Sequence, residues 1–168
     1  MIFWILFLLL ILLGIWFCIE QHVLRVRKQT LSLEHLPAGW DGVSLLQITD
    51  LHHRQMGRGN CRIIRQAQQL QPDVIVLTGD MISRDMRELS TKFRRFLQAL
   101  SKISPTYLCT GNHELDLPPE VQQEFWTMAE QAGCHPLRNE TVPLEKSGCP
   151  PLYLAGAELA YGIYRDDN

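Results

Sequence analysis

The stretch DVIVLTGD, from Asp73 to Asp80, places five apolar or β-branched residues in a row before a glycine and a carboxylate. A run this short and this apolar is typical of a strand buried on both faces of a parallel sheet. Similar runs occur before and after it in the chain, VSLLQIT (Val43–Thr49) and PTYLCTGN (Pro105–Asn112). We therefore predict three central strands.

The segments between these runs have the spacing of amphipathic helices. CRIIRQAQQLQ carries apolar residues at helical intervals and is closed by Pro72, and MRELSTKFRRFLQALSKIS (86–104) carries a second apolar stripe. A third helix is predicted in LPPEVQQEFWTMAEQAG, which begins with proline and ends with glycine. Strands that alternate with helices predict an α/β fold, with right-handed crossovers, a mainly parallel sheet and flanking helices.

Two further segments are predicted to be extended. QTLSLEHL (29–36) has the pattern of a short strand ahead of the first central one. Residues 135–162 are expected to hold two or three short strands, either at the edge of the sheet or at the start of a second layer.

The first segment of the chain is a separate part. Ile2 to Ile19 contains no charge, and as a helix it would be roughly 27 Å long, close to the thickness of a bilayer core. A cleaved signal peptide is the alternative, but no basic residue precedes the apolar run and no small residues mark a cleavage site. We predict a transmembrane anchor at 1–20, a juxtamembrane connector at 21–35 and one domain at 36–168.

The basic residues Arg25, Arg27 and Lys28 follow the predicted anchor. The positive-inside rule then favours a cytoplasmic catalytic domain, although three residues leave the side of the membrane open. The formal net charge is -2 and no basic stripe occurs, so we expect no nucleic-acid surface. The five cysteines show no paired CxxC spacing, which argues against a thiolate zinc site, and Cys109 is expected to be a small buried residue in a strand.

Polar side chains follow each of the three central strands. They are Asp50 and His52 in TDLH, Asp80 in LTGD, and Asn112, His113 and Glu114 in TGNHE. Because ligands bind beyond the carboxyl ends of parallel strands, these clusters are predicted to converge on one crevice. Carboxylate, imidazole and amide groups together suit divalent Mn, Fe, Zn or Co.

The spacing within the clusters suggests how two ions could be held. If the backbone at Asp50 and His52 stays extended, both side chains point to the same side and can reach one ion. Asp80 has two oxygens and a glycine before it, so it could bridge two ions. A pair of metal ions activates water for the hydrolysis of a phosphoester, which is the chemistry we predict.

The motifs TDLH, LTGD and GNHE, separated by about a strand and a helix each, resemble those of the calcineurin-like metallophosphoesterase family. The lead-in LPAGWDGVSLLQITDLH is similar to its membrane-anchored bacterial branch. The resemblance implies that Asp50 and His52 bind one metal ion, that Asp80 bridges two ions and that Asn112 binds the second. It also implies that His113 acts beside the scissile phosphate, as a charge stabiliser or general acid. For Glu114, a capping or salt-bridging role competes with a catalytic one.

Two features depart from the family pattern. Many relatives have an aspartate three residues after the bridging one, where this chain has Ser83. His113 is then either less well oriented or supported by Asp85 or a backbone carbonyl. The family also completes its metal site with a lone histidine and a GHxH motif downstream, whereas the only histidine after His113 is His135, in a predicted strand. The chain is therefore expected to correspond to the N-terminal portion of such a domain.

Two functions follow as alternatives. The first is a membrane-anchored hydrolase with two metal ions, acting on phosphomonoesters or phosphodiesters of lipid or cell-envelope origin. The second is an inactive remnant with a partial metal site that serves at most as a binding or interaction module. His53, next to His52, is expected to point away from the site.

Overall fold

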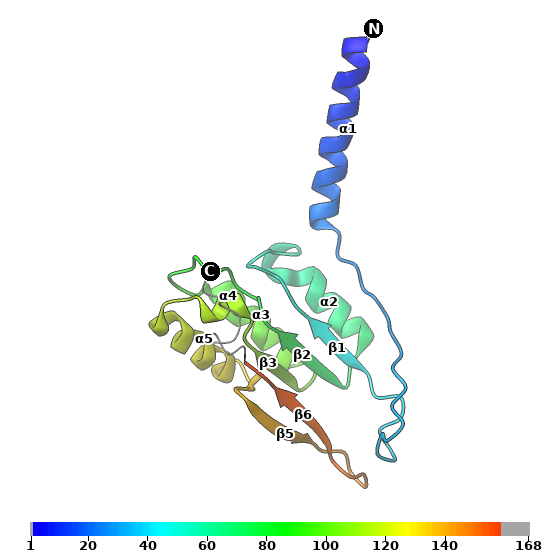
Figure 1. Ribbon diagram of the computed structural model, residues 1–168, viewed down its shortest axis with the longest axis vertical. Coiled ribbons are helices and arrows are strands. Elements are labelled where there is room, and N and C mark those ends of the chain that lie inside the picture. Colours follow the sequence, from blue (N-terminus) through cyan, green and yellow to red (C-terminus); the bar gives the residue numbers. More distant parts are fainter. Residues whose placement is uncertain (1, 159–168) are drawn as a thin grey trace, which may run out of the picture. The chain divides into compact units, whose positions relative to one another are not determined.

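The computed structural model describes residues 2–158 of the chain (Figure 1). It divides into two compact units, one from Met1 to Leu31 and one that begins at Ser32, and each is described by itself.

The first unit contains the helix α1 (Ile2–His22). Its large apolar side chains between Phe3 and Phe17 are 42% to 70% exposed. Taken over the residues that the structure describes, no helix combines the length and the apolar character needed to cross a membrane.

The second unit is built on a four-stranded sheet whose neighbouring strands are all parallel and follow the order of the chain. The strands are β1 (Leu45–Ile48), β2 (Val74–Thr78), β3 (Thr106–Cys109) and β4 (His135–Pro136). The α/β fold and the three central strands predicted from the sequence are confirmed. The short strand β4, which includes His135, extends the sheet beyond β3.

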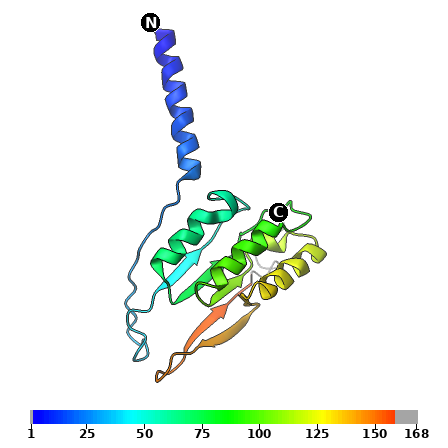
Figure 2. The same ribbon diagram turned by 180° about the vertical axis from the view of Figure 1, so that it is seen from behind.

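Helices connect the strands and cover one face of the sheet, as Figure 2 shows from behind. They are α2 (Cys61–Leu70), α3 (Thr91–Ser101) and α5 (Pro119–Gln131), with a short 3₁₀ helix at Arg58–Asn60 and the single-turn helix α4 (Asn112–Leu115). Strands in chain order joined by right-handed crossovers place every connecting helix on the same side.

The other face of the sheet is covered by a small apolar cluster. Val74 and Val76 of β2 pack there against Trp40 and Leu144. Leu144 ends β5 (Glu140–Leu144), which forms an antiparallel hairpin with β6 (Leu152–Gly156). The hairpin therefore begins a second layer, one of the two placements that the sequence suggested.

Two predicted elements are wrong in extent or kind. The segment 29–36 forms no strand: Leu31 and Leu33 are 80% and 62% exposed, and the alternation of apolar residues has no neighbouring strand to pair with among the described residues. The helix expected from residue 86 begins only at Thr91, because the Ser90 hydroxyl accepts a hydrogen bond from Phe93 N (3.2 Å) and so caps the helix.

The amino ends of β1 and β2 are joined by a carboxylate. Asp73 Oδ2 accepts hydrogen bonds from the backbone N and the hydroxyl of Ser44, both at 2.7 Å, and Asp73 N donates to Ser44 O at 2.9 Å. The backbone N–H of Ser44, and then its hydroxyl, lower the pKa of Asp73 below its ordinary value. The charged carboxylate is thus the form that the folded state prefers.

We predict that Asp73→Asn lowers the free energy of unfolding by up to about 1 kcal/mol at pH 7, a value that allows for solvent screening of this exposed group. Because the folded pKa is lowered, the stabilisation is present above the ordinary pKa of the carboxyl and is lost as the pH falls through the folded one. Urea unfolding of the wild type and of Asp73→Asn at pH 7 and at pH 3 measures the loss of stability and its dependence on pH. If the variant loses as much free energy of unfolding at pH 3 as at pH 7, this account is contradicted.

Candidate metal centre

The loops that follow β1 and β2 run side by side past the ends of the strands. Backbone N–H groups of Asp50 and His52 donate to the carbonyls of Gly79 (3.2 Å) and Asp80 (2.8 Å). Asp50, His52 and Asp80 all have positive φ values, 56°, 45° and 54°. The extended backbone expected at Asp50 and His52 is therefore wrong, and each of these side chains is directed by a left-handed turn.

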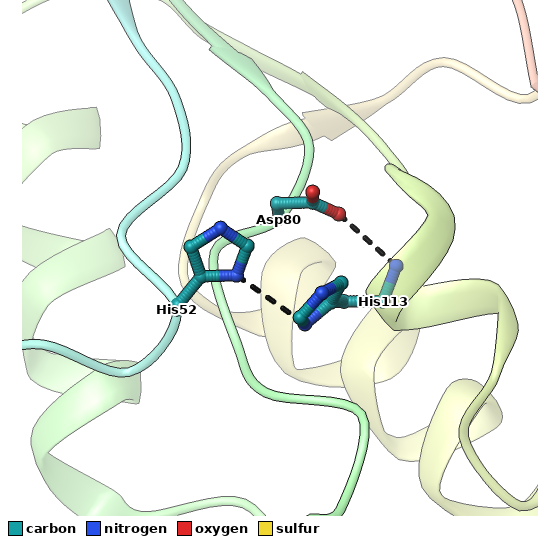
Figure 3. A group of neighbouring side chains, drawn as sticks. All are labelled: His52, Asp80 and His113. Atoms are coloured by element: carbon teal, nitrogen blue, oxygen red, sulfur yellow. Dashed lines mark hydrogen bonds between the residues drawn. The ribbon is translucent and has the colours of Figure 1, made fainter.

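Three of the predicted residues come together at the carboxyl end of the sheet: His52, Asp80 and His113 (Figure 3). One ligand atom from each lies within 4.8 Å of the others, and all three residues are half-buried. His52 Nδ1 and His113 Nδ1 are 3.3 Å apart, and His113 N donates to Asp80 Oδ1 at 3.0 Å. Two ring nitrogens that face each other need either one shared proton or a cation between them.

Asp50 lies next to this cluster but is not one of the three groups. Its Oδ1 is 3.6 Å from His52 Nε2, the ring nitrogen opposite the one that faces His113, and its side chain is 61% exposed. Thr49 Oγ1 donates to its Oδ2 at 2.7 Å. His53 lies apart from the cluster, in a hollow that it lines with Arg54.

Asn112 begins α4 beside Asp80. Its side-chain amide lies 3.1 Å from Asp80 Oδ2 and 3.0 Å from Arg84 Nη2, and both contacts are hydrogen bonds when the nitrogen faces Asp80 and the oxygen faces Arg84. Arg84 was not singled out from the sequence. Its only sequence signal is its place in GDMISR, four residues after Asp80.

Glu114 is buried at 1% exposure and joins two of the loops. Its Oε2 accepts hydrogen bonds from Asp80 N and Gly111 N, both at 2.8 Å, and its Oε1 accepts one from Ile82 N at 3.1 Å. A buried carboxylate is tolerated when backbone N–H groups satisfy it in this way. The structure therefore supports the capping role for Glu114 over the catalytic one.

Glycine is required where these loops touch. A Cβ on Gly111 would overlap Asp80 Oδ1 and lie 2.7 Å from Asp80 N, and a Cβ on Gly79 would overlap the backbone of Gly111. Gly79 also has a φ of 88°, which other residues rarely adopt. The glycines of LTGD and TGNHE thus let the two loops approach until Glu114 can bind both.

The comparison with known proteins identifies the family. The family model of calcineurin-like phosphoesterases matches residues 43–161. The chain belongs to this family. It is 27% identical, over 94% of its length and 60% of the relative's, to an uncharacterized metallophosphoesterase of Aquifex aeolicus.

Two further relatives of the chain have more specific names. The chain is 33% identical to the UDP-2,3-diacylglucosamine pyrophosphatase LpxG of Chlamydia muridarum, over 57% of this chain and 30% of that protein. It is 30% identical to a transmembrane protein with metallophosphoesterase domain of Danio rerio, over 54% of this chain and 21% of that protein. The chain spans about 60% or less of the length of these curated relatives.

Ser83 occupies the position at which the family resemblance implied an aspartate that supports His113. It contacts His52 instead. Its hydroxyl donates to the backbone carbonyl of His52 at 3.0 Å, so it fixes the loop after β1. Asp85 is exposed, and the described residues show no hydrogen bond between it and His113. The ring of His113 instead contacts His52.

Cys109, at the end of β3, lies just before the third motif, TGNHE. Burial, and then the charge of Glu114, raise the pKa of its thiol above the ordinary value. The thiol therefore stays protonated near neutral pH. The residue itself is half-buried, so the expectation of a buried residue is met only in part.

We predict that Glu114→Gln lowers the free energy of unfolding of the protein by about 2–3 kcal/mol, because the new side-chain NH₂ group faces backbone N–H groups in a buried place, so donors meet donors. Glu120→Gln, which changes an exposed residue of α5, is the matched control and should alter stability by less than about 0.5 kcal/mol. Urea unfolding at pH 7 measures both. Equal losses in the two variants would show that Glu114 does not hold the loops together.

Proposed function

We propose that this chain carries part of a metal-dependent phosphoester hydrolase with two metal ions. The observation that supports it most is the convergence of His52, Asp80 and His113 beyond the ends of three parallel strands. Each comes from a different loop, so the cluster depends on the fold and not on neighbours in sequence. The membership of the phosphoesterase family points to the same chemistry.

The donor groups fit divalent metal ions. Imidazole nitrogens and carboxylate oxygens within 4.8 Å of one another form a mixed set that suits Mn, Fe, Zn or Co. In the proposed site Asp50 and His52 would hold one ion, Asp80 would be shared by both ions and Asn112 would hold the second. When bound, such ions polarise the phosphate and lower the pKa of a bound water.

The chain's own residues orient and protonate the substrate in this proposal. The backbone N–H of His113 is fixed on Asp80, which keeps its ring at the cluster, and the half-buried ring stays accessible to a substrate. His113 then stabilises the scissile phosphate or gives a proton to the leaving oxygen. The contact between His113 and His52 also allows His113 to act as a ligand, and a pH profile of activity separates the two roles.

The proposed substrate is a phosphomonoester or phosphodiester of lipid or cell-envelope origin. The name of the Chlamydia relative, a UDP-2,3-diacylglucosamine pyrophosphatase, supports the lipid origin of the substrate. The alternative is an inactive remnant that binds metal weakly, since the described residues bring together only three grouped ligands.

We further propose that α1 anchors the enzyme in a membrane, with the domain on the cytoplasmic side. Its apolar side chains are exposed along the helix from Phe3 to Phe17, and a helix that is apolar on all sides needs apolar surroundings. The name of the Danio rerio relative supports a membrane location. Arg25, Arg27 and Lys28, which follow the helix, favour the cytoplasmic side.

We expect the purified chain with added Mn²⁺ to hydrolyse a chromogenic phosphodiester, and Asp80→Asn to lower the rate at least about 100-fold, because the bridging oxygen loses its charge. Asp85→Asn, an exposed change on the same loop, should keep the rate within about twofold. No hydrolysis by the folded, metal-loaded chain would favour the inactive remnant.

We expect the chain to float with phosphatidylcholine vesicles on a density gradient after removal of detergent. The double substitution Leu9→Lys and Leu10→Lys, in the middle of α1, should move most of the protein to the soluble fraction. Each lysine costs about 3 kcal/mol at the centre of a membrane helix. Leu31→Lys and Leu33→Lys, at two exposed leucines outside the helix, are the control. Flotation that survives the first pair of changes would refute the anchor.

A further inference from the structure

The side-chain amide of Asn112 lies between a carboxylate and a guanidinium. Asp80 Oδ2 is 3.1 Å from one end of the amide, and Arg84 Nη2 is 3.0 Å from the other. With the nitrogen toward Asp80, both neighbours are satisfied: the carboxylate accepts and the guanidinium donates. In the reverse orientation the amide oxygen faces Asp80 Oδ2, so two acceptors meet, and the amide nitrogen faces Arg84 Nη2, so two donors meet.

A metal ion would need that reverse orientation. An amide binds a cation through its oxygen, and an ion shared with Asp80 lies on the Asp80 side of Asn112. The oxygen must therefore turn toward Asp80, which breaks the hydrogen bonds to Asp80 and to Arg84. After the turn, the amide nitrogen and Arg84 Nη2 are two donors facing each other, so Arg84 has to withdraw.

Arg84 is held in place from its other side. Its Nη1 lies 3.3 Å from Asp116 Oδ2, just after the single-turn helix that begins with Asn112. The guanidinium thus spans the two ends of α4, while 54% of its side chain remains exposed. It can hold the amide without being locked there, because solvent is available to it when it leaves.

We propose that Arg84 is a positioning residue that keeps the Asn112 amide turned away from metal binding until an ion displaces it. The inference rests on the proposed function, in which Asn112 is a ligand of the second ion. Arg84 then sets the affinity of that ion through the amide, and not through its own charge. The consequence is that the site binds its second ion more weakly than its ligands alone would allow.

A double-mutant cycle tests this with Zn²⁺ and isothermal calorimetry, without any activity assay. We expect Arg84→Met to tighten zinc binding about tenfold, because the metal-free state loses a charged hydrogen bond. In an Asn112→Ala background the same change should alter the affinity by less than about twofold, since only the screened charge remains. An equal gain in both backgrounds, or weaker binding in Arg84→Met, would overturn the inference.

The metal-free chain gives a second readout, the side-chain amide resonance of Asn112 in a ¹⁵N-labelled sample. Arg84→Met should shift this resonance, whereas Arg87→Met, a change of the same kind at an exposed arginine nearby in the chain, should not. An unmoved resonance in Arg84→Met contradicts the inference. If the chain binds no zinc at all, the proposed function is contradicted. The resonance of the metal-free chain then still tests whether Arg84 holds the Asn112 amide.

Discussion

The carboxylate of Glu114 is the contact on which the candidate site depends. It is buried and accepts three backbone hydrogen bonds, from the loops after β2 and β3. Without it, three N–H groups would point at each other across a space from which water is excluded, at a cost of several kcal/mol. The carboxylate also fixes the distance between Asp80 and His113, because each belongs to one of the two loops that it joins.

The glycines on either side make that contact possible, and they explain the form of the two motifs. Gly79 and Gly111 let the backbones touch: a Cβ on Gly111 would overlap Asp80, and a Cβ on Gly79 would overlap the backbone of Gly111. The candidate site residues thus lie on two loops that are joined by close backbone contacts and one buried carboxylate. Positive φ values at Asp50, His52 and Asp80 are tolerated because hydrogen bonds between the loops fix them.

Much of the fold followed from local patterns, because those patterns report burial directly. The apolar run in DVIVLTGD became β2, and its parallel neighbours brought the three polar clusters to one edge. The elements that were wrong depend on partners that no local pattern contains. The segment 29–36 alternates like a strand but has no partner there, and a single capping serine decided where α3 begins.

Which strand ends come together could be predicted from the sequence, but the geometry of the candidate site could not. His52, Asp80 and His113 meet as expected, whereas the left-handed backbone at Asp50 and His52 sets Asp50 against the far ring nitrogen of His52. The part played by Arg84 depends on which way one amide faces, which only the surrounding donors and acceptors decide. Both ends of the sheet are held by a carboxylate. Asp73 binds Ser44 at the amino ends of β1 and β2, and Glu114 joins the loops at the carboxyl ends, where the candidate metal ligands lie.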